Sequence, residues 1–267
     1  MTYGSSHKLL ETYQLTKRFG GLTAVSDLDL TVNQGEISSL IGPNGAGKTT
    51  VFNVVTGIYR PDNGRIVFDG TDIAGKKPHK IVGKGIARTF QNIRLFPEMT
   101  CFENVMAGQH CRSSSGVWAS IFRTSKQRRE EKAIQALAEK LLQKVGLWHF
   151  KDELAKNIPY GRQRILEIAR AMASHPKLLV LDEPSSGLNP KETEDLIDFL
   201  RQLLKEGLTL FIIEHDMKVV MGISDWITVM DEGKKIAEGR PEDIYYNPLV
   251  IEAYLGKDED NSDRTKG

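Results

Sequence analysis

Residues 42–49, GPNGAGKT, decide the fold. They fit the pattern GxxxxGK[ST], in which glycines let successive backbone N–H groups face a phosphate. Lys48 would neutralise the phosphate oxygens, and the hydroxyl of Thr49 would ligate Mg²⁺. The strand-like EISSLI precedes the pattern and the helical TTVFNVV follows it, so the sequence predicts a phosphate-binding loop between a strand and a helix. The predicted loop residues are Gly42, Pro43, Asn44, Gly45, Ala46, Gly47, Lys48, Thr49 and Thr50.

Two kinds of strand surround this loop. EISSLIG, KLLVLD and LTLFIIEHD are short, mostly apolar and followed by helical patterns, as buried parallel strands are. KLLETYQL, VSDLDLTV and GRIVFDG alternate or are rich in β-formers, and Gly, Asn or Asp bounds them, as in an antiparallel sheet. The sequence therefore predicts an α/β fold with an additional antiparallel β subdomain.

A helical insert interrupts this core. Apolar residues recur at helical spacing before the stretch IPYGRQRILEIARA, and they are Ile134, Leu137, Ala138, Leu141, Leu142 and Val145. We therefore expect a helical subdomain over residues 92–172, with the α/β core that carries the phosphate loop formed by residues 8–91 and 173–240. DWITVMDEGKKIAEG predicts a hairpin that turns at residues 231–233. A C-terminal extension over residues 241–256 completes the single domain of residues 1–257, and a solvated, disordered tail over residues 257–267 follows it.

Composition excludes several classes of protein. The 267 residues carry 36 Lys and Arg against 35 Asp and Glu, and a net charge of +1 gives no reason to expect a nucleic-acid partner. No apolar run approaches the roughly 18–20 residues that span a bilayer, and the start has no apolar signal-peptide core. We expect a cytosolic chain. Its two cysteines, Cys101 and Cys111, are most simply reduced thiols, because the sequence has no CxxC.

LLVLDEPSSGLNP supplies a metal-holding residue and a base. Asp182 ends an apolar strand at the carboxyl edge of the sheet, where it could hold the Mg²⁺ shell. Glu183 could polarise a water for in-line attack on a γ-phosphate, although an isolated acid near a turn would be a surface group. His215 closes the next strand and could reach a γ-phosphate or hold the attacking water, although a lone histidine is more often structural.

Two further residues are ambiguous by themselves. Gln91 follows a strand and is typical of a solvated connector. Phe19 is either a core residue or an exposed aromatic able to stack on adenine. The basic stretch PYGRQ opens a helix as an anion site would, yet a phosphate loop already exists elsewhere in the chain.

The order of these motifs resembles an ATP-binding cassette (ABC) domain over roughly residues 8–256. In sequence order they are Phe19, GPNGAGKT, Gln91, PYGRQ, LDEP, SSGLN and His215. The resemblance implies a P-loop NTPase fold, ATP and Mg²⁺ as cofactors, and ATP hydrolysis with Glu183 and His215 as catalytic residues. It implies that Phe19 stacks on adenine, that Gln91 senses the metal and the membrane partner, and that Thr49, Gln91 and Asp182 hold the metal.

The resemblance also explains why PYGRQ would form a second anion site. Two such domains dimerise head to tail, and PYGRQ of one closes over the ATP held by the phosphate loop of the other. The ATP-contacting residues there would be Tyr160, Gly161, Arg162 and Gln163. The usual signature is LSGGQ, so phosphate contact here would rest on the Gly161 backbone, the helix N-terminus and Arg162. Asn189 stands where an aspartate is usual.

Finer features resemble the ATPase subunits of branched-chain amino acid importers, specifically the component termed G. They are YGRQRILEIARA, DEPSSGLNP and the segment from Glu214 to Gly256. This implies a second ATPase subunit, or a homodimer in isolation, two transmembrane permeases, an indirect periplasmic binding protein and no nucleic acid. The chain would be peripheral on the cytoplasmic face of the inner membrane. The alternative is a soluble non-transport ABC ATPase of the translation or DNA-repair type, and the single cassette without a basic domain argues against it.

Two segments suggest contact with membrane partners. The basic segment of residues 109–132 could touch a permease or the membrane, or be a solvated loop that runs into a helix. The apolar IRLFPEMTCF directly follows Gln91. We expect it to form a groove for a short permease helix, lined by Phe96, Pro97 and residues 99–102.

Overall fold

A mixed sheet forms the middle layer of the molecule. The computed structural model describes residues 7–109 and 125–254, without the side chains of residues 125–128. The order of the sheet is β10-β9-β3-β8-β7-β6, and every pair except β10 with β9 is parallel. The strands are β3 (Ile37–Ile41), β6 (Ile86–Arg88), β7 (Leu178–Asp182), β8 (Thr209–Ile213), β9 (Trp226–Asp231) and β10 (Lys234–Gly239). The predicted parallel strands and the predicted hairpin are thus confirmed.

Both faces of this sheet are covered, which explains why its central strands are mostly apolar. All five residues of β7 are buried. Leu178 and Val180 pack toward the antiparallel sheet, whereas Leu179 and Leu181 pack toward the helices. Because successive strand residues face opposite sides, a strand with two covered faces has no position that faces solvent.

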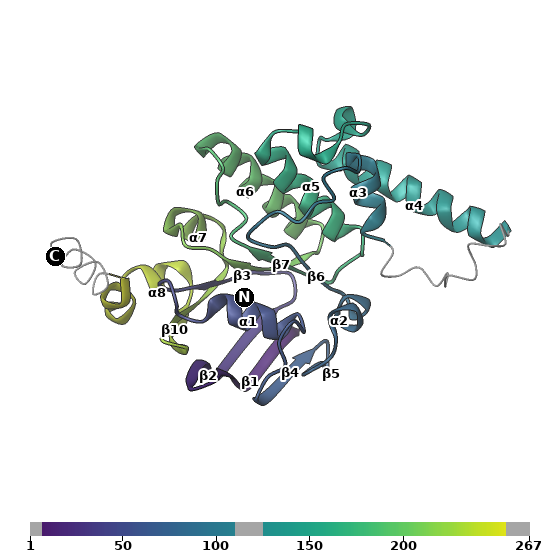
Figure 1. Ribbon diagram of the computed structural model, residues 1–267. Coiled ribbons are helices and arrows are strands. Elements are labelled where there is room, and N and C mark those ends of the chain that lie inside the picture. The colour runs from purple at the N-terminus through teal and green to yellow at the C-terminus, as the bar shows by residue number, and fades with distance from the viewer. Residues whose placement is uncertain (1–6, 110–124, 255–267) are drawn as a thin grey trace.

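A separate antiparallel sheet forms the second layer, in the order β2-β1-β4-β5. Its strands are β1 (Lys8–Phe19), β2 (Leu22–Asn33), β4 (Asn63–Phe68) and β5 (Thr71–Asp72). The short helix α1 (Lys48–Val55) shares one hydrophobic cluster with this sheet and with β3, β7 and β8. Figure 1 shows α1 above the antiparallel sheet. The predicted β subdomain is confirmed.

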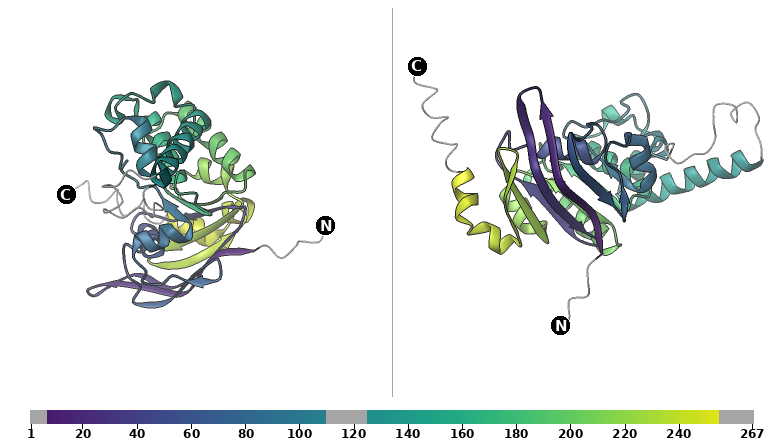
Figure 2. Two further views of the ribbon diagram at one scale, coloured as in Figure 1. Left: turned by 90° about the vertical axis from the view of Figure 1, so that its right-hand side faces the viewer. Right: turned by 90° about the horizontal axis from the view of Figure 1, so that it is seen from below.

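Helices form the third layer, on the opposite face of the mixed sheet (Figure 1). They include α3 (Cys101–Ala107), α4 (Ser125–Lys144), α5 (Tyr160–Met172) and α6 (Pro190–Lys205), with the short turns η2 (Trp148–Phe150) and η3 (Ala155–Asn157). Figure 2 shows that α4 projects away from the rest of the molecule. Smaller helices include α2 (Pro78–Lys84), α7 (Met217–Ile223) and α8 (Pro241–Tyr245), and residues 248–254 are also helical.

Some expectations lie outside the described residues. They concern residues 110–124 of the basic segment and the tail after residue 254. Within the described ranges, no helix is both long enough and apolar enough to cross a membrane.

Candidate functional site

Four strands lead to the candidate site from one edge of the mixed sheet. β3 leads into the phosphate loop, β6 toward Gln91, β7 into Glu183 and β8 toward His215. Because these strands are parallel, all four connections leave from the same edge. This is the edge at which open α/β sheets bind ligands. The fold therefore gathers residues that are far apart in sequence.

The phosphate loop ends at the first turn of α1. Gly47 is the N-cap, with φ of 99°, and no side chain caps the helix. The first N–H groups of α1 are therefore available to an anion. The Lys48 side chain is buried, and its ammonium donates to the carbonyl oxygens of Gly42 at 2.6 Å and Pro43 at 2.9 Å. These contacts hold the lysine inside the loop.

Asp182 lies at the end of β7 and is 2% exposed. Its Oδ2 accepts a hydrogen bond from Arg88 Nη2 at 2.7 Å. Its Oδ1 is buried and has no hydrogen-bond partner among the residues that the structure describes. Buried carboxylate oxygens are rarely left without a partner, so this atom fits a metal or a metal-bound water.

The small number of protein oxygen donors at this site also fits Mg²⁺. Thr49 lies in the first turn of α1 and is exposed. Across residues 7–109 and 125–254, no three His, Cys, Asp or Glu side chains group as a metal site. Mg²⁺ keeps several waters and is commonly bound by one or two carboxylates together with substrate phosphates, so a small protein donor set is sufficient.

Glu183 joins Gln91 and His215 in one cluster. Its Oε2 accepts from Gln91 Nε2 at 2.9 Å and lies 3.5 Å from His215 Nδ1. The Glu183 backbone has φ of 47°, a left-handed conformation that costs a non-glycine residue about 1–3 kcal/mol. The structure thus places three of the predicted residues in contact, with His215 half exposed to solvent.

Glu214 is a member of this region that the sequence analysis did not single out. It is 1% exposed, and its carboxylate accepts from the backbone N–H of Ser185 at 2.9 Å and of His215 at 3.2 Å. It therefore ties the loop after Glu183 to the loop that carries His215. An acid at the end of the apolar strand FIIEHD was the available signal.

Phe19 is exposed rather than buried in the core. Its ring is 42% exposed and contacts Tyr59 edge to face at 5.1 Å between centroids. The Lys17 ammonium lies 5.2 Å from the Phe19 centroid. An exposed ring held by a second ring can stack on a nucleobase.

The predicted second anion site, PYGRQ, lies at the start of α5. Its N-cap is Pro159, and no side chain caps the helix. Gln163 Nε2 donates to the carbonyl oxygen of Ile158 at 3.0 Å, so this side chain secures its own turn. A Cβ on Gly161 would lie 2.5 Å from Oε1 of Glu192, so this carboxylate covers the glycine.

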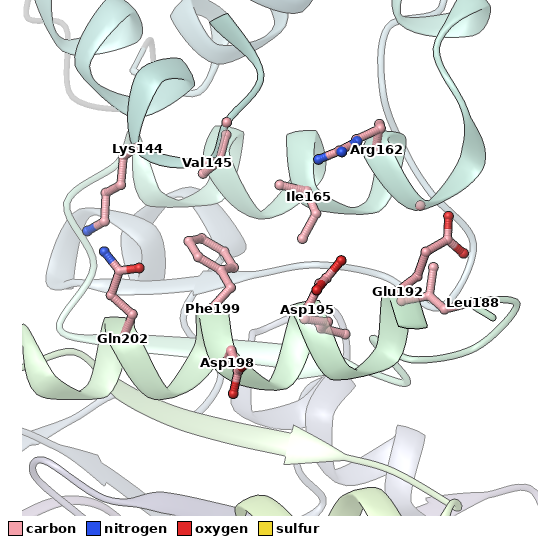
Figure 3. Close-up of a pocket in the computed structure, with 13 residues that line it drawn as sticks. Lys144, Val145, Arg162, Ile165, Leu188, Glu192, Asp195, Asp198, Phe199 and Gln202 are labelled. Atoms are coloured by element: carbon pink, nitrogen blue, oxygen red, sulfur yellow. The ribbon is translucent and has the colours of Figure 1, made fainter. Parts of the chain in front are cut away.

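Figure 3 shows the groove beside Gly161, between the start of α5 and α6. It has a volume of about 430 Å³, and Arg162 lies across from acidic residues of α6. Its described lining comes from residues 144–146, the start of α5 and residues 188–202, and includes no residue of the phosphate loop. The acidic residues are Glu192, Asp195 and Asp198.

A buried arginine links α5 to the segment that carries Gln91. The Arg164 side chain is fully buried, and it donates to the carbonyl oxygens of Phe90 and Gln91, both at 2.8 Å. It also donates to the Tyr160 hydroxyl at 3.2 Å and to Glu167 at 3.3 Å. Burial raises the pKa of Glu167, and the Arg164 charge opposes that shift. Gln91 and the start of α5 therefore share one anchor.

The segment predicted to line a groove for a permease helix lies only partly at the surface. Phe96 is 48% exposed, but Cys101 is fully buried. The hydroxyl of Thr100 caps α3 and turns Cys101 into the core. A cavity of about 300 Å³ lies nearby, lined by Ile93, Leu95, Pro97, Ala155, Lys156 and Gln163. Placing residues 99–102 together in the lining was therefore wrong for Cys101.

Known proteins share the whole of this architecture. The family described as ABC transporter matches residues 25–186, and one described as branched-chain amino acid ATP-binding cassette transporter matches residues 234–260. The high-affinity branched-chain amino acid transport ATP-binding protein BraF of Pseudomonas aeruginosa is 49% identical, over 94% of this chain and 99% of that protein. LivG of Escherichia coli, with the same description, is 46% identical over the same shares.

Solved structures agree with these relatives. An ATP-binding cassette of an ABC transporter in its ADP conformation is 34% identical and superimposes with a TM-score of 0.83, covering 94% of this chain and all of that one. A nucleotide-free cassette is 34% identical, with a TM-score of 0.82 over 92% of this chain and 98% of that chain. The chain therefore belongs to the ABC transporter family, as an ATP-binding cassette.

Proposed function

We propose that this chain is the ATP-hydrolysing subunit of a membrane importer whose transported solutes are branched-chain amino acids. The main observation in support is that the phosphate loop and the cluster of Glu183, Gln91 and His215 lie at the same edge of the mixed sheet. The relatives described above support the solute, because their names specify branched-chain amino acid transport.

ATP would bind with its phosphates on the phosphate loop. Lys48 would leave its carbonyl partners for the β- and γ-phosphate oxygens, and Phe19 would stack on adenine. Mg²⁺, when bound, would neutralise the charge that develops on the phosphate oxygens. The Thr49 hydroxyl and Asp182 Oδ1 would hold it, with Gln91 at its edge.

Hydrolysis would begin at the carboxylate of Glu183. This group accepts a proton from a water placed in line with the γ-phosphate, and the Gln91 amide fixes its orientation. His215 would hold the same water or the γ-phosphate. The strained backbone of Glu183 supports this role, because such strain clusters at functional sites.

A second nucleotide-binding subunit would complete each site. The N-terminus of α5, with Tyr160, Gly161, Arg162 and Gln163, would face ATP on the phosphate loop of that subunit. Glu192 covers Gly161, so its carboxylate would have to withdraw before an anion could approach. The partner subunit would be a different ATPase or a second copy of this chain.

Membrane permeases would contact the groove beside Phe96. We place the assembly on the cytoplasmic face of the inner membrane, with a periplasmic binding protein as an indirect partner and no nucleic acid involved. The rival function, a soluble non-transport ABC ATPase, lacks such a membrane partner.

Two variants test the site. We expect Lys48→Ala to abolish ATP binding, and Glu183→Gln to keep ATP binding while turnover falls about 100-fold or more. Fluorescent-nucleotide binding and phosphate release measure the two quantities, with the exposed Glu194→Gln as control. Wild-type turnover in Glu183→Gln would remove this residue from the mechanism.

A separate experiment tests the solute. Absence of leucine uptake by vesicles that hold the complete, ATP-hydrolysing assembly would contradict the proposed solute.

A further inference from the structure

Arg88 is the last residue of β6, next to the proposed metal site. We propose that Arg88 is a positioning residue that fixes Asp182 relative to α1, so that only Oδ1 of Asp182 is left for the shell of the metal. This inference rests on the proposed function, which assigns Asp182 and Thr49 to the metal.

The Arg88 guanidinium joins β7 to α1. Nη2 donates to Asp182 Oδ2 at 2.7 Å, while Nη1 donates to Asn53 Oδ1 at 2.6 Å and Thr56 Oγ1 at 3.1 Å. Asn53 lies within α1 and Thr56 is its C-cap. Because Thr49 lies in the first turn of the same helix, the guanidinium links Asp182 to the helix that carries Thr49.

The surroundings of Arg88 hold the guanidinium in place. Its side chain is 7% exposed, and that of Asp182 is 3% exposed. The guanidinium lies 4.9 Å from the ring centroid of Phe90 and 5.8 Å from that of Phe52. Burial lowers the pKa of Arg88, and its bond to Asp182 opposes that shift. A planar group that lies over two rings and donates hydrogen bonds to two elements has little freedom to turn.

The bond also divides the two oxygens of Asp182 by role. Oδ2 is taken by Arg88, whereas Oδ1 is buried without a hydrogen-bond partner in the described part of the chain. If Arg88 were lost, the carboxylate could rotate, and either oxygen or neither would meet the metal. Partners of this kind, behind a metal-holding group, typically change metal affinity by about 10–100-fold.

The test separates metal binding from nucleotide binding. The first measurement is Mn²⁺ affinity, from the spin-resonance signal of free Mn²⁺ in the presence of a non-hydrolysable ATP analogue. The second is the affinity for a fluorescent ATP analogue in EDTA. We expect Arg88→Met to weaken Mn²⁺ binding about tenfold or more, and to change metal-free nucleotide binding by less than about threefold.

Arg170→Met is the matched control, because Arg170 is a largely buried arginine paired with an acid, Glu167, on α5. It should leave both affinities unchanged. Arg88→Lys keeps the charge, but a compact ammonium cannot reproduce the forked hydrogen bonds of the guanidinium to Asp182 and α1. Its Mn²⁺ affinity should therefore lie between those of the natural protein and Arg88→Met. If Arg88→Met does not fold, Arg88→Lys carries the test with the same expected selectivity for the metal.

A double-mutant cycle with Asp182→Asn decides the mechanism. If Arg88 acts through Asp182, adding Arg88→Met to Asp182→Asn should weaken Mn²⁺ binding no further. Additive losses, or equal losses of Mn²⁺ and metal-free nucleotide affinity, would overturn the inference and leave Arg88 a structural ion pair. Unchanged Mn²⁺ affinity in Asp182→Asn alone would instead remove Asp182 from the proposed metal site.

Discussion

Gly42 and Gly45 belong to the same phosphate loop but have different surroundings. A Cβ on Gly42 would lie 2.0 Å from the backbone oxygen of Met230, and the residue has φ of 147°. A Cβ on Gly45 would meet nothing within 4 Å, although φ is 84°. Gly42 therefore lets the loop approach β9, whereas Gly45 only provides a backbone conformation.

This contrast gives a prediction for a pair of alanine variants. We expect Gly42→Ala to destabilise the fold by more than about 3 kcal/mol, because backbone cannot yield as a side chain does. Gly45→Ala should cost about 1–2 kcal/mol, which is the strain of a left-handed alanine. Urea unfolding measures both values. Equal destabilisation of the two variants would show that contact with β9 is not the deciding factor.

Asn189 shows how an element can tolerate an unusual residue. Its side-chain oxygen accepts from Glu192 N at 2.9 Å, and Glu192 Oε2 accepts from Asn189 N at 3.0 Å. This capping box starts α6 and fixes the side chain that covers Gly161. Asparagine and aspartate are nearly equal as N-caps, so the departure from the usual aspartate preserves this local role.

Two substitutions at Asn189 check this interpretation. Asn189→Ala should lower the free energy of unfolding by about 1 kcal/mol, because the N–H of Glu192 loses its acceptor. Asn189→Asp should stay within about 0.5 kcal/mol of the natural protein. Denaturant titration of both variants measures the difference. A loss in Asn189→Asp as large as that in Asn189→Ala would mean that the amide has a partner besides the cap.

The elements were more predictable from the sequence than their contacts. The apolar runs of β7 and β8 predicted buried parallel strands, because a strand covered on both faces has no position that faces solvent. By contrast, the Arg88–Asp182 bond joins residues 94 positions apart. The cover of Gly161 by Glu192 likewise depends on how α5 meets α6. Periodicity describes one element at a time and cannot specify such pairs.

At the scale of the whole molecule, we expect the surface around Phe96, next to the cavity lined by Leu95 and Pro97, to transmit movement between a permease and this chain rather than to take part in catalysis. Phe96 is 48% exposed, and the Arg170 guanidinium lies 5.7 Å from its ring centroid. Neither residue belongs to the cluster around Glu183. A permease helix seated here would contact the segment that leads from Gln91 into α3.

We therefore expect Phe96→Asp to uncouple transport from hydrolysis. Uptake by vesicles that hold the assembled importer should fall about tenfold or more, because a charge would have to be buried in an apolar contact. Basal phosphate release by the isolated chain should change less than about twofold. Tyr245→Asp, at a similarly exposed aromatic on α8, is the control. Parallel losses of uptake and basal hydrolysis would assign Phe96 to folding instead.

The Arg164 anchor has a thermodynamic consequence. It ties the backbone of Gln91, which would lie beside this chain's own nucleotide, to the start of α5, which would serve the nucleotide of the opposite subunit. Any free energy by which one nucleotide favours a position of that anchor must reappear as a changed affinity for the other, because linkage is reciprocal. Binding at the two sites would then be coupled, and replacing Arg164 should move the Hill coefficient of nucleotide binding in the assembled pair toward 1.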